Sequence, residues 1–308
     1  MMNFSQNIQI NIPLLQDKGV LLYVKREDLL HPFISGNKFR KLKYNIQEAK
    51  NQKKDCLLTF GGAYSNHILA TAAAGKEFGF KTVGVIRGEE LGIDLEKNFD
   101  KNPTLKQAHQ FGMEFLFVSR AEYQQKNETD FLASLLNKYP NCYILPEGGT
   151  NSLAIKGCEE ILSETDKDFT HVCCALGTGG TVTGIINSSA AKQNILVFPS
   201  LKGSWIADEI NSLKPNKQNW KVISEYHFGG YGKVSEELIT FINQFKKDTN
   251  ILLDPIYTGK MLFGILDLIK NNHFKKESKI LAIHTGGLQG IAGMNLLLKQ
   301  KNKTIINE

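Results

Sequence analysis

A lysine that follows a small, flexible tripeptide is the residue of this chain best suited to covalent chemistry. Lys38 lies within residues 35–41, Ser-Gly-Asn-Lys-Phe-Arg-Lys, whose glycine permits a sharp turn. Asn37 can bond nearby backbone where a helix opens, and the charges of Arg40 and Lys41 would lower the pKa of Lys38. A neutral amine attacks carbonyl carbons to form a Schiff base. Most lysines near a helix start are simply solvated, so Lys38 alone decides nothing.

Polar side chains follow a glycine pair in the stretch Phe-Gly-Gly-Ala-Tyr-Ser-Asn-His, residues 60–67. Ser65, Asn66 and His67 would gather at a helix N-terminus, a place suited to a carboxylate or phenolate oxygen. The alternative is structural: Ser65 or Asn66 caps the helix and His67 lies on the surface.

A second glycine loop, residues 177–181, reads Gly-Thr-Gly-Gly-Thr and follows an apolar strand pattern. Such a loop presents backbone N–H groups and hydroxyls to a phosphate. It is not a dinucleotide fingerprint, because Val182 stands where that motif needs glycine, and it is not a P-loop.

Two more glycine loops follow strand patterns, at residues 147–151 and 284–287. A further segment, residues 254–260, is read as a strand-end loop and carries Tyr257 and Thr258. One lysine, one phosphate pocket and several hydroxyls together indicate pyridoxal phosphate as the cofactor.

Alternating strand and helix patterns must position these loops. The expected strands are 55–60, 81–87, 114–118, 142–146, 171–176, 195–198 and 279–284. The expected helices are 66–78, 102–112, 128–139, 152–162, 236–247, 259–271 and 289–299, besides one that begins near Lys38. This rhythm predicts parallel sheets with helices on both faces, and ligand sites at the carboxyl ends of the strands. A chain of 308 residues is long for one core, so two lobes are expected.

Composition excludes several classes of function. The formal net charge is +6, with lysines scattered in short clusters, which fits an anionic small ligand better than nucleic acid. The chain contains no apolar run of about 18 residues, so no membrane-spanning helix is expected. The N-terminus lacks a secretory signal pattern, so a cytoplasmic location is expected. The five cysteines show no CxxC spacing, which favours reduced, buried thiols and no metal site.

The motifs occur in one order along nearly the whole chain. They are Lys25-Arg-Glu-Asp28, Ser35-Gly-Asn-Lys38 with Lys41, Gly62 to His67, Glu147 to Asn151, Gly177 to Thr181, Asp254 to Lys260 and His284 to Gly287. This set resembles the 1-aminocyclopropane-1-carboxylate deaminase and D-cysteine desulfhydrase family, within the tryptophan-synthase-β-like, fold type II enzymes that use pyridoxal phosphate.

The resemblance implies a two-domain α/β fold with parallel-sheet, three-layer architecture. Residues 1–41 and 146–308 would form the large cofactor-binding domain, and residues 42–145 a small inserted domain. Members of this group are commonly homodimers, so a homodimer is expected.

The resemblance also implies roles for individual residues. Lys38 matches the lysine that binds the cofactor covalently, Lys41 a phosphate partner, Asn66 the partner of the 3-hydroxyl, and Thr258 the residue facing the pyridine nitrogen. The phosphate cup would be Gly177, Thr178, Gly179, Gly180 and Thr181. The catalytic set would be Lys38, Ser65, Tyr231 and Tyr257, and the substrate would meet Ser65, Asn66, His67, Tyr231, Tyr257 and Thr285.

Two positions favour the desulfhydrase type over the deaminase type. Deaminase-type members typically carry Glu where this chain has Thr258 and Leu where it has Thr285. A glutamate near the pyridine nitrogen favours its protonated form and a stronger electron sink, which opening of a cyclopropane ring needs more than loss of a thiolate. His67 favours the desulfhydrase type as well. Tyr64 departs from the usual Gln and leaves the pocket shape open.

The expected reaction is therefore β-elimination and deamination of a small D-amino acid, with D-cysteine giving pyruvate, sulfide and ammonia. The alternatives are ring opening of 1-aminocyclopropane-1-carboxylate to 2-oxobutanoate and ammonia, a lyase for another β-substituted amino acid, and a non-catalytic protein that binds an anion or nucleotide.

Overall fold

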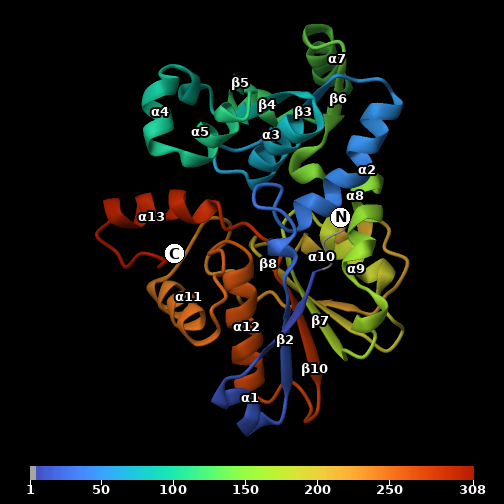
Figure 1. Ribbon diagram of the computed structural model, residues 1–308, viewed down its shortest axis with the longest axis vertical. Helices are drawn as coiled ribbons and strands as arrows, with labels where there is room; N and C mark the ends of the chain where they lie inside the picture. Colours follow the sequence, from blue (N-terminus) through green and yellow to red (C-terminus); the bar gives the residue numbers. More distant parts are fainter. Residues whose placement is uncertain (1–4) are drawn as a thin grey trace.

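The computed structural model describes residues 5–308, which fold around two β-sheets (Figure 1). The strands are β1 Asn7–Ile10, β2 Leu21–Lys25, β3 Cys56–Gly61, β4 Lys81–Arg87, β5 Met113–Val118, β6 Cys142–Leu145, β7 His171–Leu176, β8 Asn194–Pro199, β9 Trp220–Val222 and β10 Lys279–Ile283. The α-helices are α1 Pro13–Lys18, α2 Asn37–Asn51, α3 Asn66–Phe78, α4 Leu95–Lys101, α5 Pro103–Gln110, α6 Arg120–Gln124, α7 Thr129–Lys138, α8 Ser152–Cys158, α9 Gly180–Ser188, α10 Ile206–Ser212, α11 Glu236–Thr249, α12 Thr258–Lys270 and α13 Gly290–Gln300.

The larger sheet has six strands in the order β1-β2-β10-β7-β8-β9. Its strands run parallel except β1, which pairs antiparallel with β2 at one edge. Strand β10 comes last in the chain but lies between β2 and β7, so the two ends of the sequence meet in one sheet. The loops after β7 and β10 therefore leave the same edge of the sheet.

Alternate residues of β7 enter two separate hydrophobic cores. Cys173 and Ala175 pack in a core with residues of α11, α12 and α13. Cys174 and Leu176 point the other way, into a core with residues of α9 and α10. Figure 1 shows these two groups of helices on opposite sides of the sheet. The predicted three-layer α/β/α architecture is confirmed.

The smaller sheet has four parallel strands in the order β5-β4-β3-β6. Leu57 of β3 packs against residues of α2 and α3, whereas Leu58 and Phe60 enter a core with residues of α6 and α7. In Figure 1 this sheet and its helices form the upper part of the molecule. All four strands lie within residues 42–145, the range expected for the inserted domain; the domain boundaries themselves stay a prediction.

Most expected elements are present, and helix α3 and strand β4 match their predicted ranges residue for residue. The four glycine loops follow β3, β6, β7 and β10, as predicted. The interpretation of residues 254–260 as a strand-end loop is wrong: this segment follows irregular chain after α11 and opens α12. No helix within the described residues is long and apolar enough to cross a bilayer.

Two of the five cysteines form a disulfide, although all five were expected to be reduced. Cys56 and Cys142 are register partners on the adjacent parallel strands β3 and β6, and a disulfide joins them. The expectation that all five thiols are reduced is therefore corrected, because sheet pairing brings together two residues that are 86 positions apart. Cys158, Cys173 and Cys174 are free and buried, as expected.

Candidate active site

The loop that precedes Lys38 interlocks with the loop that follows β10. The Asn37 amide donates a hydrogen bond to the Thr285 carbonyl over 3.2 Å. Gly36 adopts φ +61°, and a β-carbon there would collide with the same carbonyl. Thr285 is buried beside this contact. The glycine is thus required both for its backbone conformation and for the close approach of the two loops.

Lys38 is the second residue of α2, at the loop-to-helix junction that the sequence predicted. Its ammonium donates to the Gly148 carbonyl at 3.4 Å. Burial and the neighbouring Lys41 charge hold the pKa of Lys38 well below its ordinary value. Arg40 was expected to contribute to this lowering, but its guanidinium is paired with the buried Glu27 at 2.9 Å. The lowered pKa favours the neutral, nucleophilic amine.

Lys41 lies one turn further along α2 and ties together two glycine loops. Its ammonium donates to the Gly148 carbonyl at 2.9 Å, to the Thr150 hydroxyl at 2.9 Å and to the Thr178 hydroxyl at 3.3 Å. Burial lowers the pKa of Lys41 to about 8. A cation held among hydroxyls in this way is placed to receive a phosphate.

The loop after β7 leads into α9, whose N-terminal amides carry no side-chain cap from any residue between 5 and 308. Uncapped amides at a helix start favour an anion. The Thr181 hydroxyl, in the first turn, accepts hydrogen bonds from the Asn37 amide at 2.8 Å and from the Cys158 thiol at 3.9 Å. With these donors at its oxygen, the Thr181 hydroxyl is free to donate its own proton elsewhere.

For the loop after β3, the alternative to a ligand site was a helix cap at Ser65 or Asn66 with His67 on the surface. The structure agrees with the cap but not with the surface position. The Ser65 hydroxyl caps α3, accepting from the backbone N–H groups of His67 and Ile68 at 3.3 and 3.4 Å. His67, however, is 1% exposed and not on the surface. Its ring lies against Gly149, where a β-carbon would come within 2.7 Å. Burial and the charges of Lys38 and Lys41 hold the pKa of His67 well below its ordinary value, so the ring is neutral.

Two tyrosines lie on the far side of the same cluster. The rings of Tyr231 and Tyr257 meet edge to face, with centroids 6.2 Å apart. Tyr257 also lies against Gly177, the first residue of the loop after β7. Burial raises the pKa of both hydroxyls, and raises that of Tyr257 well above its ordinary value. Both side chains are therefore proton donors at neutral pH.

The sequence matches the family described as pyridoxal-phosphate dependent enzymes over residues 9–286. The chain belongs to this family.

Two similar sequences and one similar crystal structure show which pyridoxal-phosphate-dependent enzymes the chain resembles. A protein of Pyrococcus abyssi named "Putative 1-aminocyclopropane-1-carboxylate deaminase" is 31% identical over 305 residues, covering 90% of this chain and 87% of that protein. The bifunctional D-cysteine desulfhydrase/1-aminocyclopropane-1-carboxylate deaminase of Arabidopsis thaliana mitochondria is 29% identical, with coverages of 91% and 75%. The crystal structure of an ACC deaminase homologue aligns with TM-score 0.79 and 26% identity, over 96% of this chain and 93% of that one. The predicted family, enzyme class and cofactor are confirmed.

The residues of this pyridoxal-phosphate-dependent enzyme fit its cofactor by three independent observations. The Asn66 carbonyl oxygen and both ring nitrogens of His67 are buried and have no hydrogen-bond partner among the described residues. Buried polar atoms without partners are rare and call for a ligand. Lys38, with its lowered pKa, and the uncapped start of α9 beside Lys41 supply an amine for an aldehyde and a site for a phosphate.

Thr258 is fully buried at the first residue of α12, and its hydroxyl is already engaged. It donates to the Asp254 carboxylate at 2.7 Å and accepts from the Asp254 amide at 3.0 Å. The same carboxylate accepts from the backbone N–H groups of Ile256 and Tyr257. Asp254 therefore holds the backbone that leads into α12 and fixes the amide of Tyr257, a role that sequence reasoning missed.

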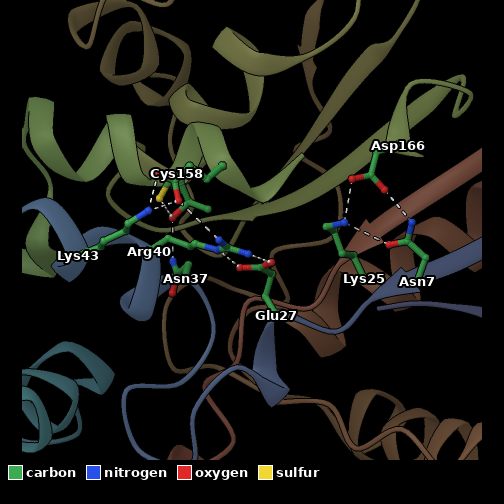
Figure 2. A network of polar contacts seen from close by, with 10 residues as sticks. Asn7, Lys25, Glu27, Asn37, Arg40, Lys43, Cys158 and Asp166 are labelled. Carbon is green, nitrogen blue, oxygen red and sulfur yellow. Dashed lines mark hydrogen bonds and ion pairs between the residues drawn. The ribbon is translucent and has the colours of Figure 1, made fainter. Parts of the chain in front are cut away.

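The Lys-Arg-Glu-Asp motif that begins at Lys25 is structural rather than chemical. Figure 2 shows Lys25 between Asp166 and Asn7, with the ammonium 2.8 Å from the Asp166 carboxylate, and Glu27 paired with Arg40 of α2. The Lys25–Asp166 pair joins β2 to the segment that precedes β7, and the Glu27–Arg40 pair joins the segment after β2 to the first turn of α2, where Lys38 lies. Removing one partner of such a pair leaves a buried charge uncompensated, so these residues have a structural reason to be present.

Proposed function

We propose that this enzyme is a lyase that eliminates the β-substituent of a small D-amino acid and releases ammonia, with D-cysteine as its substrate. The overall reaction converts D-cysteine and water into pyruvate, hydrogen sulfide and ammonia. The cofactor would be held covalently by Lys38, through its phosphate by Lys41 and residues 177–181, and through its ring oxygen by Asn66. Bound there, pyridoxal phosphate withdraws electron density from the α-carbon of the amino acid.

Lys38 is the base of the proposed reaction. Because burial and Lys41 lower its pKa, its amine is available to accept the α-proton near neutral pH. The contact of its nitrogen with the Gly148 carbonyl supports a defined position for that amine. The neutral ring of His67 lies near both lysines and would accept or pass on a proton without adding a charge to the site.

The α-carboxylate of the substrate would lie at the start of α3. The Ser65 hydroxyl accepts from two backbone amides, and its own proton stays available for a carboxylate oxygen. The positive end of the α3 dipole adds to this attraction. Thr285 would complete the substrate contacts from the loop after β10.

The two tyrosines would serve the leaving group. A hydroxyl with a raised pKa stays protonated at neutral pH and donates its proton to a departing thiolate. Tyr257 is the more buried of the two, whereas Tyr231 is 52% exposed. We therefore assign the proton donor to Tyr257 and the ordering of the substrate side chain to Tyr231.

The choice of substrate depends on Thr258, which is expected to face the ring nitrogen of the cofactor. Its side chain is a neutral hydroxyl that is already hydrogen-bonded to Asp254. Its proton is donated to Asp254, so it offers the nitrogen only a remaining lone pair. A neutral group stabilises a protonated ring nitrogen less than a carboxylate does, and the cofactor is then a weaker electron sink. Loss of a thiolate needs less of this stabilisation than opening of a cyclopropane ring.

A second candidate reaction is the conversion of 1-aminocyclopropane-1-carboxylate to 2-oxobutanoate and ammonia. The names of the relatives favour it, since the Pyrococcus protein carries the deaminase name and the Arabidopsis protein carries both names. Homodimer formation is a further proposal, which rests on resemblance alone and is tested by light scattering of the purified protein.

A substrate panel separates the two reactions. The purified holoenzyme is incubated with D-cysteine, L-cysteine and 1-aminocyclopropane-1-carboxylate, and sulfide and 2-oxo acid are both measured. We expect sulfide and pyruvate in equal amounts from D-cysteine, and slower release of 2-oxobutanoate from the cyclopropane substrate. Release of 2-oxobutanoate that is faster than release of sulfide would overturn the proposal in favour of the deaminase reaction.

A further inference from the structure

Lys260 is a buried lysine that the reaction described above does not use. It is the third residue of α12, and its side chain is 2% exposed. Its ammonium donates to the backbone carbonyls of His227 and Gly230, at 2.9 Å each. Both carbonyls belong to the loop that carries Tyr231. The lysine thus joins this loop to the helix that begins beside Tyr257.

A lysine at this position is disfavoured by its surroundings. A cation in the first turn of a helix opposes the positive end of the helix dipole. Burial also removes water from the ammonium and lowers the pKa of Lys260 to about 8. An apolar residue would fill this space without either cost. A lysine adds here the two carbonyl contacts and an attraction to the Asp254 charge, and the carbonyl contacts are its direct hydrogen bonds.

The loop depends on those contacts for its shape. Residues 227–232 form neither helix nor strand, and Phe228, Gly229, Gly230 and Gly232 all have positive φ angles. Two successive turns close through the same carbonyls: the Gly230 amide donates to the His227 carbonyl at 3.0 Å, and the Lys233 amide donates to the Gly230 carbonyl at 3.2 Å. Lys260 therefore occupies the second acceptor site of each turn and holds the two turns together.

Tyr231 lies inside the second of these turns, half exposed, with its ring against Tyr257. Tyr257 is the aromatic ring that Tyr231 contacts, and the turn beneath Tyr231 sets the direction from which its ring reaches Tyr257. We propose that Lys260 is a positioning residue, which clamps the turns of residues 227–233 so that the Tyr231 hydroxyl stays beside Tyr257 and the substrate. This inference rests on the proposed role of the two tyrosines.

The test compares Lys260→Met with Lys270→Met, a substitution of an exposed lysine in the last turn of the same helix. The first readout needs no substrate: hydrogen exchange in the peptide that spans residues 227–234 of the holoenzyme, followed by mass spectrometry. We expect exchange to be about tenfold faster or more in Lys260→Met and unchanged in Lys270→Met. Unchanged exchange in Lys260→Met would overturn the clamp.

The second readout places the effect at Tyr231. Lys260→Met should lower kcat about tenfold or more, with a smaller change in KM, because a small displacement of a catalytic group costs rate. In a Tyr231→Phe background the same substitution should lower kcat by less than about twofold, since the hydroxyl to be positioned is gone. Equal losses in both backgrounds would show a purely structural role and overturn the proposal.

A second variant covers misfolding of Lys260→Met, and the exchange measurement separates failure of the clamp from failure of the proposed reaction. Should Lys260→Met fail to fold, Lys260→Gln, which keeps a shorter donor, goes through the same two measurements and should show the same pattern at smaller size. If no amino acid of the substrate panel is turned over, the proposed reaction fails, while the exchange measurement still decides whether Lys260 holds the loop.

Discussion

The side-chain amide of Asn37 donates a hydrogen bond of 2.8 Å to the hydroxyl of Thr181, a residue 144 positions away. Asn37, labelled in Figure 2, opens α2 immediately before Lys38. Thr181 lies in the first turn of α9. We expected Asn37 to bond local backbone, but its side chain instead connects α2 to the first turn of α9. The Lys38 amine and the loop expected to bind phosphate, residues 177–181, are thereby held together.

This hydrogen bond also sets the direction of the Thr181 proton. The hydroxyl oxygen accepts from Asn37 and from the Cys158 thiol, so its hydrogen points to a third partner. In Asn37→Leu the donor is lost at similar side-chain size, and the hydroxyl can turn away from the phosphate. We expect the dissociation constant of pyridoxal phosphate from the apoenzyme to rise about three- to tenfold, the worth of one net hydrogen bond.

Absorbance titration of the apoenzyme measures this constant. The matched control is Asn51→Leu at the other end of α2, where the side chain is exposed and bonds only to Gln47 among the described residues. Its affinity should equal that of the unchanged protein. Equal affinities in all three proteins would contradict the role given to Asn37.

Lys41 predicts a pH dependence of phosphate binding. Its pKa is about 8 because burial disfavours the ammonium, yet a phosphate dianion is bound best by the charged form. Affinity should therefore be highest near pH 7, where the phosphate is a dianion and Lys41 is charged, and should fall as the pH rises through 8. At pH 9 the loss should be about tenfold, since one unit above the pKa leaves about a tenth of the amine protonated.

The probe for this measurement is pyridoxine 5′-phosphate, which has no aldehyde and so leaves the chemistry of Lys38 out of the binding. In Lys41→Arg the guanidinium stays charged, and the affinity should not change between pH 7 and 9. A fall of affinity above pH 8 that persisted in Lys41→Arg would assign the titration to another group.

Lys38→Ala tests the covalent role of the central lysine. Without its amine, the holoenzyme should lose its absorbance near the visible edge, and borohydride should no longer trap the cofactor on the protein. Turnover should fall by about 10²–10⁴-fold or more, the usual range for a lost general base. Lys50→Ala, an exposed lysine later in α2, should change none of these. An unaltered absorbance band in Lys38→Ala would refute the assignment.

The sequence allowed the loops of this site to be predicted because their position depends on local patterns. Helix α3 and strand β4 are continuous apolar runs whose lengths distinguish a buried helix from a buried strand, and a glycine pair after a strand marks a turn wherever the strand lies. The position of Lys38 at a loop-to-helix junction could be predicted in the same way, since a small flexible tripeptide before a helix is visible in the chain itself.

Contacts that depend on sheet order could not be predicted. The disulfide between Cys56 and Cys142 follows from β3 and β6 being neighbours, which no spacing in the sequence reveals. The carbonyls that Lys260 binds lie 30 and 33 residues before it, in a loop without periodicity. The burial of His67 could not be predicted from local patterns, which left a surface position open, because its cover, Gly149, comes from a different strand end.

Tyr64, the departure from the family pattern, lies between the end of α4 and helix α13. Its hydroxyl donates to the Lys101 carbonyl at 3.2 Å, and its ring lies on Gly293 of α13, where a β-carbon would come within 2.8 Å of two ring carbons. The ring therefore connects the loop of Ser65 and Asn66 to a helix that packs with the larger sheet. Gly293 supplies the space that this ring needs.

This fit predicts that Gly293→Ala changes the free energy of unfolding in opposite directions, depending on whether Tyr64 is present. Gly293→Ala should lower the free energy of unfolding by about 1–3 kcal/mol, because the new methyl group overlaps the Tyr64 ring. In a Tyr64→Ala background the overlap is gone, and the same substitution should be neutral or stabilising by up to about 1 kcal/mol, the usual gain of Ala over Gly inside a helix. Urea denaturation of the four proteins gives both values. A loss of equal size in both backgrounds would show that Gly293 is required for a reason other than the ring.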